Sequence, residues 1–197
     1  MSPYGIVLYG PPASGKDTIT AALNRLDPQV VLLPKLKVGT GRPDGYEFVT
    51  AEHLDRLRAE GRLLVETRRY GNVYAVDRRT VADRQAAGYV SVVHMGNIPD
   101  LRTLMDRTPD SWLRVLLWVP REVTAQRSKA RGDADTDQRL AAWDETLADL
   151  EAHADAGFFH LRIHTDRLSP DAAARQIMEA YGRLRAAGRP HAEECPR

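Results

Sequence analysis

The 197-residue sequence is long enough for one domain of ordinary size, and its 43% hydrophobic content is sufficient to bury a core. Its 28 Lys and Arg residues nearly balance 27 Asp and Glu residues, so a net charge of +1 gives no general reason to expect a nucleic-acid or membrane partner. The only cysteine, Cys195, excludes an internal disulfide framework and argues against a cysteine nucleophile or a zinc cluster. Because the sequence contains neither a leader nor a long apolar span, we expect a cytoplasmic protein, monomeric or homodimeric.

A glycine-rich stretch follows the first apolar run, residues 6–9, and leads into a helical pattern. It has the sequence G-P-P-A-S-G-K-D-T over residues 10–18. This is the context of a phosphate-binding loop, or P-loop, in which glycines let the backbone wrap around an anion at a helix N-terminus. Lys16 is then expected to reach the outer phosphates of a nucleotide. The residues expected to bind ATP are Gly10, Ala13, Ser14, Gly15, Lys16, Asp17 and Thr18.

One position departs from the usual pattern G-x-x-x-x-G-K-[ST]. Asp17 occupies the position at which a hydroxyl normally helps to hold Mg²⁺, and Thr18 is the nearest substitute. We therefore expect Asp17 and Thr18 to be the Mg²⁺ ligands of the loop.

Five apolar runs alternate with segments of helical periodicity. They cover residues 6–9, 30–33, 89–93, 115–119 and 158–163. Because these runs are continuous and do not alternate with polar residues, they favour a parallel sheet covered on both faces. The sequence therefore predicts an α/β fold of the P-loop type, with three layers (α/β/α) around a five-stranded parallel sheet, as a single domain over 1–197 with a frayed tail at 187–197.

Residues 35–77 have a different character. The apolar runs shorten, turn residues appear, and strands are expected at 46–49, 63–65 and 73–76, with a short helix about Leu54 and Leu57. We interpret this segment as a small inserted lobe. It is rich in groups suited to phosphate and ring recognition, namely Arg42, Tyr46, Glu66, Arg68, Arg69 and Tyr74, although Arg68 and Arg69 are more typical of a solvated face. His94 follows a strand at the sheet edge where doubly wound folds bind ligands.

An arginine-rich segment, residues 127–139, lies between the fourth and fifth apolar runs. Arg127 and Arg131 are four residues apart and share a helix face, and Gly132 ends that helix before Arg139 begins the next. In a chain that contains a P-loop, three arginines around a turn predict a lid that closes on the transferring phosphate. The alternative is a solvated corner in which Asp133, Asp135 and Asp137 pair with them.

The order of these parts resembles guanylate kinase and its relatives over almost the whole chain. Besides the P-loop, residues 44–49 (D-G-Y-E-F-V) are similar to the family's D-G-x-x-Y-x-F-V, residues 64–66 (L-V-E) to F-L-E, and residues 71–76 (G-N-V-Y-A-V) to G-N-Y-Y-G-[ST]. Later matches lie at 117–120, 131–132, 139–140 and 164–166.

The resemblance implies an ATP- and Mg²⁺-dependent kinase acting on a small phosphorylated acceptor, most simply a purine nucleoside monophosphate of the GMP type. Lys16, Arg127, Arg131 and Arg139 would be catalytic. The acceptor would be bound by Arg42 and Tyr46 at its phosphate, by Glu66 at its base or sugar edge, and by Tyr74 and His94. No general base is expected, because a phosphate monoester is already a nucleophile.

Two departures leave the acceptor open. Positions at which guanylate kinases carry groups that read guanine hold Val76 and Val93 here. The loop ending in G-K-D and the strand end V-H-M-G at 93–96 resemble a second branch, the ribose 1,5-bisphosphate phosphokinases, which make phosphoribosyl pyrophosphate. A kinase for another phosphorylated metabolite, or a non-catalytic binding module of the guanylate-kinase-like type, are the remaining alternatives.

Overall fold

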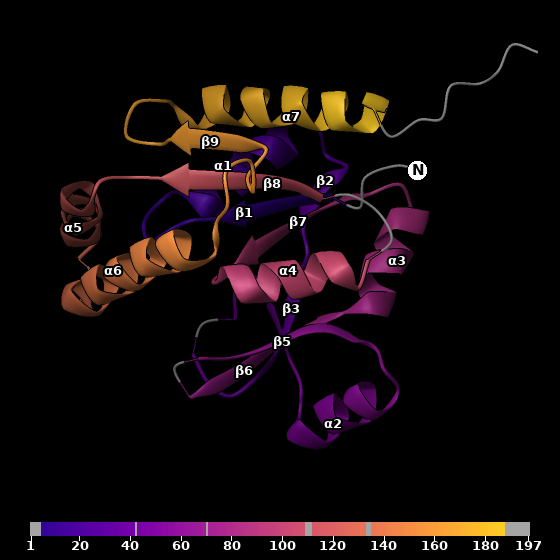
Figure 1. Ribbon diagram of the computed structural model, residues 1–197. Helices are drawn as coiled ribbons and strands as arrows, with labels where there is room; N and C mark the ends of the chain where they lie inside the picture. The colour runs from indigo at the N-terminus through magenta and orange to yellow at the C-terminus, as the bar shows by residue number, and fades with distance from the viewer. Residues whose placement is uncertain (1–4, 42, 70, 109–111, 133–134, 188–197) are drawn as a thin grey trace, which may run out of the picture.

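The centre of the molecule is a parallel β-sheet of five strands. The computed structural model describes residues 5–41, 43–69, 71–108, 112–132 and 135–187. The strands lie in the order β2-β7-β1-β8-β9, and each neighbouring pair is parallel (Figure 1). Their bounds are β1 (Gly5–Tyr9), β2 (Val30–Leu32), β7 (Val90–Met95), β8 (Trp112–Trp118) and β9 (Leu161–His164). The predicted five-stranded parallel sheet is confirmed.

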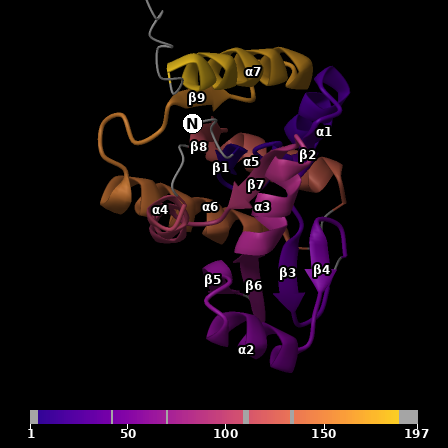
Figure 2. The same cartoon turned by 90° about the vertical axis from the view of Figure 1, so that its right-hand side faces the viewer.

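Helices cover both faces of this sheet (Figures 1 and 2). In β1, Ile6 and Leu8 pack against α1 and α7, whereas Val7 and Tyr9 point to the opposite face, toward α3, α4 and α6. This alternation on a fully buried strand produces two hydrophobic cores. The helices are α1 (Lys16–Leu26), α3 (Arg78–Ala86), α4 (Ile98–Asp106), α6 (Thr136–His153) and α7 (Pro170–Ala187). The three-layer α/β/α arrangement is confirmed.

The ends of the last two strands differ from the prediction. β8 begins at Trp112 instead of Val115, and β9 begins at Leu161, so Phe158 and Phe159 precede it. The ring of Phe159 stacks on Tyr9 at 5.4 Å, and Phe158 is buried in the core. These two residues are apolar because they cover the sheet, not because they belong to it.

A second sheet of four strands forms the inserted lobe, residues 35–77, which extends from one end of the molecule (Figure 2). Its order is β4-β3-β6-β5, and helix α2 (Ala51–Ala59) packs on it. The strands are β3 (Lys35–Val38), β4 (Tyr46–Phe48), β5 (Leu63–Arg69) and β6 (Asn72–Asp77). The sequence analysis missed β3, whose Lys-Leu-Lys-Val pattern places a lysine at every second position.

The two faces of the lobe sheet have different partners. Leu36 of β3 and Ala75 of β6 are paired neighbours and pack with Leu54 and Leu57 of α2. Lys37 pairs with Tyr74 on the opposite face, which is turned toward the P-loop end of the large sheet. The alternation of side chains along each strand therefore decides which lobe residues reach the ligand side.

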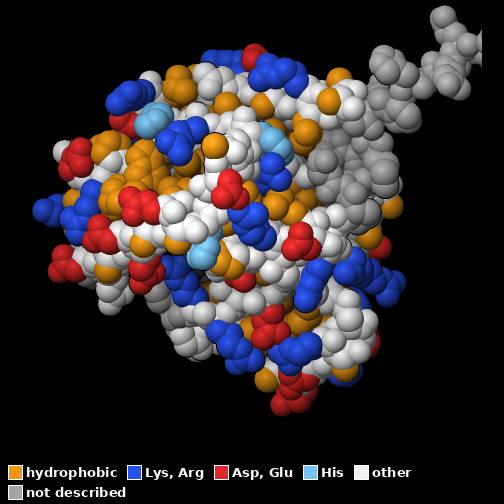
Figure 3. All heavy atoms as spheres, in the orientation of Figure 1, with side chains coloured by type: hydrophobic (Ala, Val, Ile, Leu, Met, Phe, Trp, Pro, Cys, Tyr) orange, Lys and Arg blue, Asp and Glu red, His pale blue; other side chains and the backbone are white. Residues whose placement is uncertain are grey.

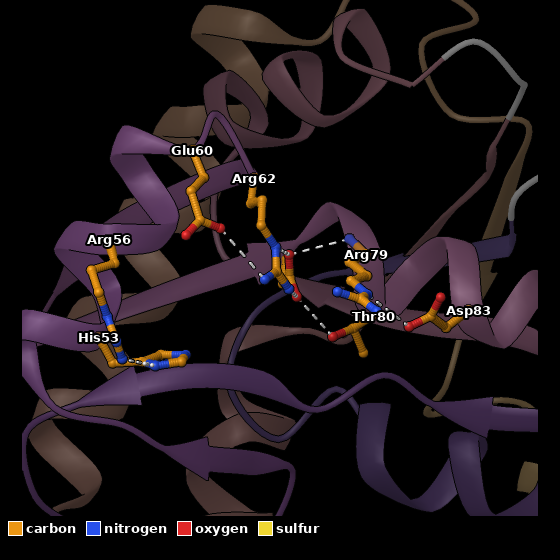
Figure 4. Close-up of polar contacts among 8 residues, drawn as sticks. His53, Arg56, Glu60, Arg62, Arg79, Thr80 and Asp83 are labelled. Carbon is orange, nitrogen blue, oxygen red and sulfur yellow. Dashed lines mark hydrogen bonds and ion pairs between the residues drawn. The ribbon is translucent and has the colours of Figure 1, made fainter.

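Arg62, labelled in Figure 4, holds the root of the lobe by its pairing with Asp77. Arg62, just before β5, contacts both carboxylate oxygens of Asp77, with Nε 3.1 Å from Oδ1. Asp77 also accepts a hydrogen bond from the Arg79 N–H, and one of 3.1 Å from the Thr80 hydroxyl, so that it caps α3. Burial alone would raise the pKa of Asp77, but these hydrogen bonds outweigh it and hold the pKa below its usual value.

The remaining helix, α5 (Arg121–Ala130), precedes α6 at the P-loop end of the molecule. Lys and Arg side chains are interspersed with Asp and Glu on the face of the molecule drawn in Figure 3. Within the described part of the chain, no helix is both long and apolar enough to span a membrane.

Candidate active site

The loop between β1 and α1 has the backbone conformation of an anion cradle. Gly10, Ala13 and Gly15 have positive φ angles of 152°, 58° and 88°. A Cβ atom at Gly10 would lie 2.1 Å from the carbonyl oxygen of Leu117, so only glycine fits there. Gly15 is the N-cap of α1 and provides no side-chain cap, which leaves the first-turn N–H groups of that helix for a ligand.

Carbonyl oxygens of the loop accept hydrogen bonds from Lys16 and from α5. Lys16 Nζ donates to the carbonyls of Gly10 (2.8 Å) and Pro11 (2.9 Å) and to Ser14 Oγ (3.3 Å). Thr124 Oγ1, from α5, donates to the Pro12 carbonyl at 3.3 Å, and Arg127 donates to that of Ala13 at 2.9 Å. Groups that would repel a phosphate are thus engaged elsewhere, as a phosphate-binding loop requires.

Lys16 is held in an environment that disfavours its charge. Burial lowers the pKa of Lys16 to about 8; nearby Asp17 opposes this shift, while Lys35 and Arg69 add to it by repulsion. Three cations from different parts of the chain therefore meet at the loop. Such an arrangement is typical of a site that binds an anion.

One cavity, of about 450 Å³, opens on the α5 side of the loop; we call it the α5-side cavity. Arg127 spans it, with Nη2 2.6 Å from the Thr165 carbonyl and Nη1 on the Ala13 carbonyl. The other polar side chains at its wall are Thr18, Arg131 and Thr165, whose hydroxyl accepts from Arg127 Nη1 at 3.2 Å. Its lining residues are Ala13, Gly15, Thr18, Ile19, Arg127, Ala130, Arg131, Thr165, Leu168 and Pro170.

The predicted lid arginines are only partly brought together. Arg127 and Arg131 share the α5-side cavity, as their spacing predicts. Arg139, in the first turn of α6, is not among its described lining residues; its Nε donates to Asp135 at 2.8 Å and holds the pKa of that carboxyl below its usual value. The pairing of Arg139 with an aspartate is the salt-bridged corner that the sequence analysis gave as the alternative. A role for these arginines in closure stays a prediction.

A second cavity, of about 230 Å³, opens between the loop and the lobe; we call it the lobe-side cavity. Its wall brings together the P-loop, the carboxyl end of β7 and one face of the lobe sheet. The predicted residues Lys16, Asp17, Tyr46, Tyr74 and His94 all line it. The remaining lining residues are Lys35, Thr67, Arg69, Met95 and Gly96.

An aromatic group with a buried lysine lies on the same face of the lobe. The Tyr46 and Tyr74 rings are 5.3 Å apart, and Lys37 Nζ lies 4.9 Å from the Tyr46 and Phe48 centroids and 5.6 Å from that of Tyr74. Lys37 is 3% exposed, so these rings are a large part of its surroundings. The sequence analysis did not identify Lys35 or Lys37; the available signal was their alternation with Leu36 and Val38.

Arg69 reaches from the lobe to the main body of the protein. Its Nη2 forms an ion pair of 2.5 Å with Glu145 of α6, and its Nη1 lies 3.5 Å from the Gly96 carbonyl. This side chain lines the lobe-side cavity, whereas its neighbour Arg68 lies on the other face and pairs with Glu66. The expectation of a solvated face therefore holds for Arg68 and is wrong for Arg69.

One predicted acceptor residue, Glu66, faces away from the lobe-side cavity. Glu66 points toward α2, where it pairs with Arg58 at 2.8 Å, and the next residue, Thr67, faces the cavity instead. One residue along a strand reverses the side-chain direction, which accounts for the difference. Arg42 lies outside the described residues.

His94 joins the end of β7 to α1. Its Nε2 lies 2.8 Å from Thr20 Oγ1, whose hydroxyl donates to the Lys16 carbonyl, and its Nδ1 lies 3.6 Å from Asp17 Oδ1. His94 is therefore in contact with the segment that carries Lys16 and Asp17. Its direct contact with an acceptor stays a prediction.

Asp17 and Thr18, the predicted metal ligands, open to different cavities. The Asp17 side chain is 67% exposed and adjoins Lys16, whereas Thr18 lines the α5-side cavity. In the described part of the chain, no group of three or more His, Cys, Asp or Glu side chains could hold a metal ion. A single carboxylate fits Mg²⁺, which is commonly held by one or two carboxylates together with water and substrate phosphates.

Solved structures share this arrangement of parts. A guanylate kinase from Anaplasma phagocytophilum superposes with a TM-score of 0.61 at 17% identity, covering 97% of this chain and 89% of that one. A gluconokinase from Sinorhizobium meliloti 1021 superposes with a TM-score of 0.54 at 16% identity, covering 95% and 97%. These likenesses show a P-loop kinase fold.

Curated sequences give the family, although no protein-family model matches the chain. A guanylate kinase of Anaeromyxobacter dehalogenans (strain 2CP-C) is 28% identical over 195 residues, which cover 93% of this chain and 83% of the relative. A guanylate kinase of Streptomyces kasugaensis is 31% identical over 150 residues, which cover 72% and 73%. The chain belongs to the guanylate kinase family.

Membership of the guanylate kinase family makes this chain an enzyme, a phosphotransferase of the kinase class, and not a non-catalytic binding module. The P-loop and the lobe are two of the parts that carry the resemblance, and their residues line two cavities on either side of one loop. The ribose 1,5-bisphosphate branch stays a prediction.

Proposed function

We propose that this enzyme transfers the γ-phosphoryl group of ATP to the phosphate group of a small phosphorylated acceptor. The observation that carries the proposal is the position of the P-loop, with Gly15 in the wall of the α5-side cavity and Lys16 in the wall of the lobe-side cavity. ATP would enter from the α5 side and the acceptor from the lobe side. Donor and acceptor would then meet at Lys16, as in-line phosphoryl transfer requires.

In the proposed step, an oxygen of the acceptor phosphate forms a bond to the γ-phosphorus of ATP. The bond between that phosphorus and the β,γ-bridging oxygen breaks, and this oxygen stays on ADP. ADP leaves with the electron pair, and no proton needs to move. Lys16 would exchange the carbonyls of Gly10 and Pro11 for phosphate oxygens. Arg131 and Arg139 would add positive charge to the transferring group if the segment 127–139 closes as a lid.

Mg²⁺ would offset the negative charge of the β- and γ-phosphates when it is bound. Asp17 is the residue that would hold it, directly or through water, since its carboxylate is exposed beside Lys16. Tyr46 and Tyr74 would hold the acceptor phosphate together with Arg42.

Nucleoside monophosphates are the acceptors to test first, and GMP is the first of these. This choice rests on the relatives named guanylate kinase and on the tyrosine pair of the lobe. The two valines at positions that read guanine in the family, Val76 and Val93, are buried at 1% and 0% exposure and offer no hydrogen bond to a base.

The proposal is tested by ADP release from ATP and Mg²⁺ with each of GMP, AMP and ribose 1,5-bisphosphate. Lys16→Met is expected to lower kcat with any accepted substrate by about 10³-fold, because it removes a preorganised charge from the transferring phosphate. The unfolding temperature of Lys16→Met should be no lower than that of the wild type, since burial disfavours the charge of Lys16. Arg183→Met, an exposed change on α7, is the control. Unchanged turnover in Lys16→Met would contradict the proposal.

A further inference from the structure

Cationic side chains outnumber carboxylates among the described lining residues of the lobe-side cavity. Lys16, Lys35 and Arg69 line it, and Lys37 lies behind the tyrosine rings of the same face. Asp17 is the one carboxylate among its described lining residues, and it belongs to the P-loop side. The excess of cations lies on the lobe, where the acceptor would be recognised.

Most of these cations have a partner in the protein. Lys16 donates to three oxygens of the loop, Arg69 pairs with Glu145 and contacts the Gly96 carbonyl, and Lys37 lies among three rings. Each has therefore exchanged its hydration for other favourable contacts.

Lys35 differs from them. Its Nζ donates to no acceptor among the residues that the structure describes, although it lies in the cavity wall between the lobe and His94. Burial lowers its pKa to about 8, and the charge of Asp100 opposes that shift. Asp100 is already engaged, because its Oδ2 accepts hydrogen bonds from Thr67 and from Asn97 Nδ2, the latter at 2.8 Å.

Two other carboxylates lie near Lys35 without forming a pair with it. Asp17 and Asp44 share with it the wall of a smaller hollow of about 50 Å³ beside the cavity. Lys35 is therefore a partly buried ammonium group that carries donors only and faces a space large enough for a ligand. An anionic group of a ligand is the partner that would compensate its burial.

The described lobe residues in the wall of this cavity include no carboxylate that could accept from a guanine base. The Watson–Crick edge of guanine presents N–H donors, which a carboxylate accepts best. Glu66 points instead toward α2 and pairs with Arg58, and Val76 and Val93 are apolar. The cavity wall beside Lys35 therefore suits an anionic group of the acceptor better than a guanine base.

We propose that the acceptor carries a second anionic group besides the phosphate that receives the phosphoryl group, and that Lys35 binds this second group. The inference rests on the proposed phosphoryl transfer and narrows the class of its acceptor. A nucleotide with a further phosphate and a sugar bisphosphate share this chemistry, while a nucleoside monophosphate lacks it. Lys35 is then a specificity-determining residue of the lobe side.

The test compares three acceptors, GMP, guanosine 3′,5′-bisphosphate and ribose 1,5-bisphosphate, on the wild type and on Lys35→Met, Lys35→Arg and Arg68→Met. Arg68→Met removes a positive charge from the other face of the same sheet and serves as the matched control. We expect at least one of the bisphosphates to have a lower KM than GMP. Lys35→Met should raise that KM at least about tenfold, because a charged hydrogen bond is lost, while Lys35→Arg restores part of it and Arg68→Met changes it less than twofold.

Calorimetric binding of the same three compounds separates this inference from the proposed function. If no acceptor yields ADP, the proposed phosphoryl transfer is contradicted. Weaker binding of a bisphosphate to Lys35→Met than to the wild type would still support the second anion site. A loss of affinity in Lys35→Met that is equal for GMP and the bisphosphates would overturn the inference, since Lys35 would then hold the accepting phosphate or a base oxygen. Tighter binding of GMP than of either bisphosphate would overturn it as well.

Discussion

The two cavities beside the P-loop are built in different ways. The α5-side cavity is built around the P-loop, whose backbone conformation depends on glycines and is braced by Arg127, and its wall is completed by α5 and residues of the segment 165–170. The lobe-side cavity adds to Lys16 and Asp17 of the P-loop the side chains of four lobe strands and of the end of β7, and its charge depends on those side chains. A site that depends on the backbone conformation of a glycine-rich loop tolerates few substitutions. A site that depends on side chains of a sheet face can change its ligand specificity through single substitutions.

Arg127→Ala gives the largest effect expected on the α5 side. It removes the fork that joins the Ala13 and Thr165 carbonyls, so the loop loses a brace and the KM for ATP should rise about tenfold or more. The measurement is ADP release as a function of ATP concentration. Arg121→Ala, on the same helix but paired with exposed Asp144, is the control and should change the KM for ATP less than twofold. An unchanged KM in Arg127→Ala would mean that the loop keeps its shape unaided.

Asp17→Asn tests whether the two sides share a metal ion. If the carboxylate helps to bind Mg²⁺, its replacement should raise the Mg²⁺ concentration needed for half-maximal activity about three- to tenfold. The free energy of unfolding should change little. Asp171→Asn is a matched control, an exposed acid in the first turn of α7 that pairs with Arg25. An unaltered Mg²⁺ requirement would leave Asp17 with a role at the helix N-terminus only.

Lys35→Met measures how much the burial of the Lys35 charge lowers the free energy of unfolding. The pKa of Lys35 is about 8 in the folded protein and near 10.5 when unfolded, so the unfolded chain binds more protons between these values and stability rises with pH across that window. We expect Lys35→Met to be more stable than the wild type at pH 7 by about 1 kcal/mol after allowance for solvent screening, and the difference to shrink toward pH 10. Urea unfolding at pH 7 and pH 10 provides the comparison, and a variant less stable at pH 7 would contradict it.

Glu66→Gln and Thr67→Val, neighbours on opposite faces of β5, give the smallest effects. Glu66→Gln should leave the acceptor KM within twofold, because its carboxylate faces Arg58 and α2. Thr67→Val removes a hydroxyl from the cavity wall and should raise that KM about threefold. The reverse order of effects would show that the lobe turns Glu66 toward the acceptor when one is bound.

The P-loop was predictable because all of its determinants lie in nine consecutive residues. Strand, glycines, lysine and helix follow each other, and each requires the others locally. The five strands of the large sheet were also predictable in number and order along the chain, because a doubly covered strand is apolar at every position.

The lobe was harder to predict because its sheet is held by pairings distant in sequence. β3 presents lysines at alternate positions, and a lysine usually indicates an exposed side chain, so neither the strand nor the inward direction of Lys35 and Lys37 was evident. The direction of Glu66 depends on the register between β5 and β6, which local sequence does not specify. Tertiary structure decides which charged side chains are buried, and the lysines of β3 that were not predicted are such cases.

Two ion pairs of unequal exposure lie at the two ends of the β5–β6 strand pair in the lobe. Arg62 and Asp77 join its root where Asp77 is 6% exposed and also caps α3. Arg69 and Glu145 join its far end to α6, with side chains 30% and 64% exposed, and an ion pair in such a position contributes about 1 kcal/mol or less. The pair at the root of the lobe is thus the better shielded from water, and the pair at its far end is the easier of the two to break.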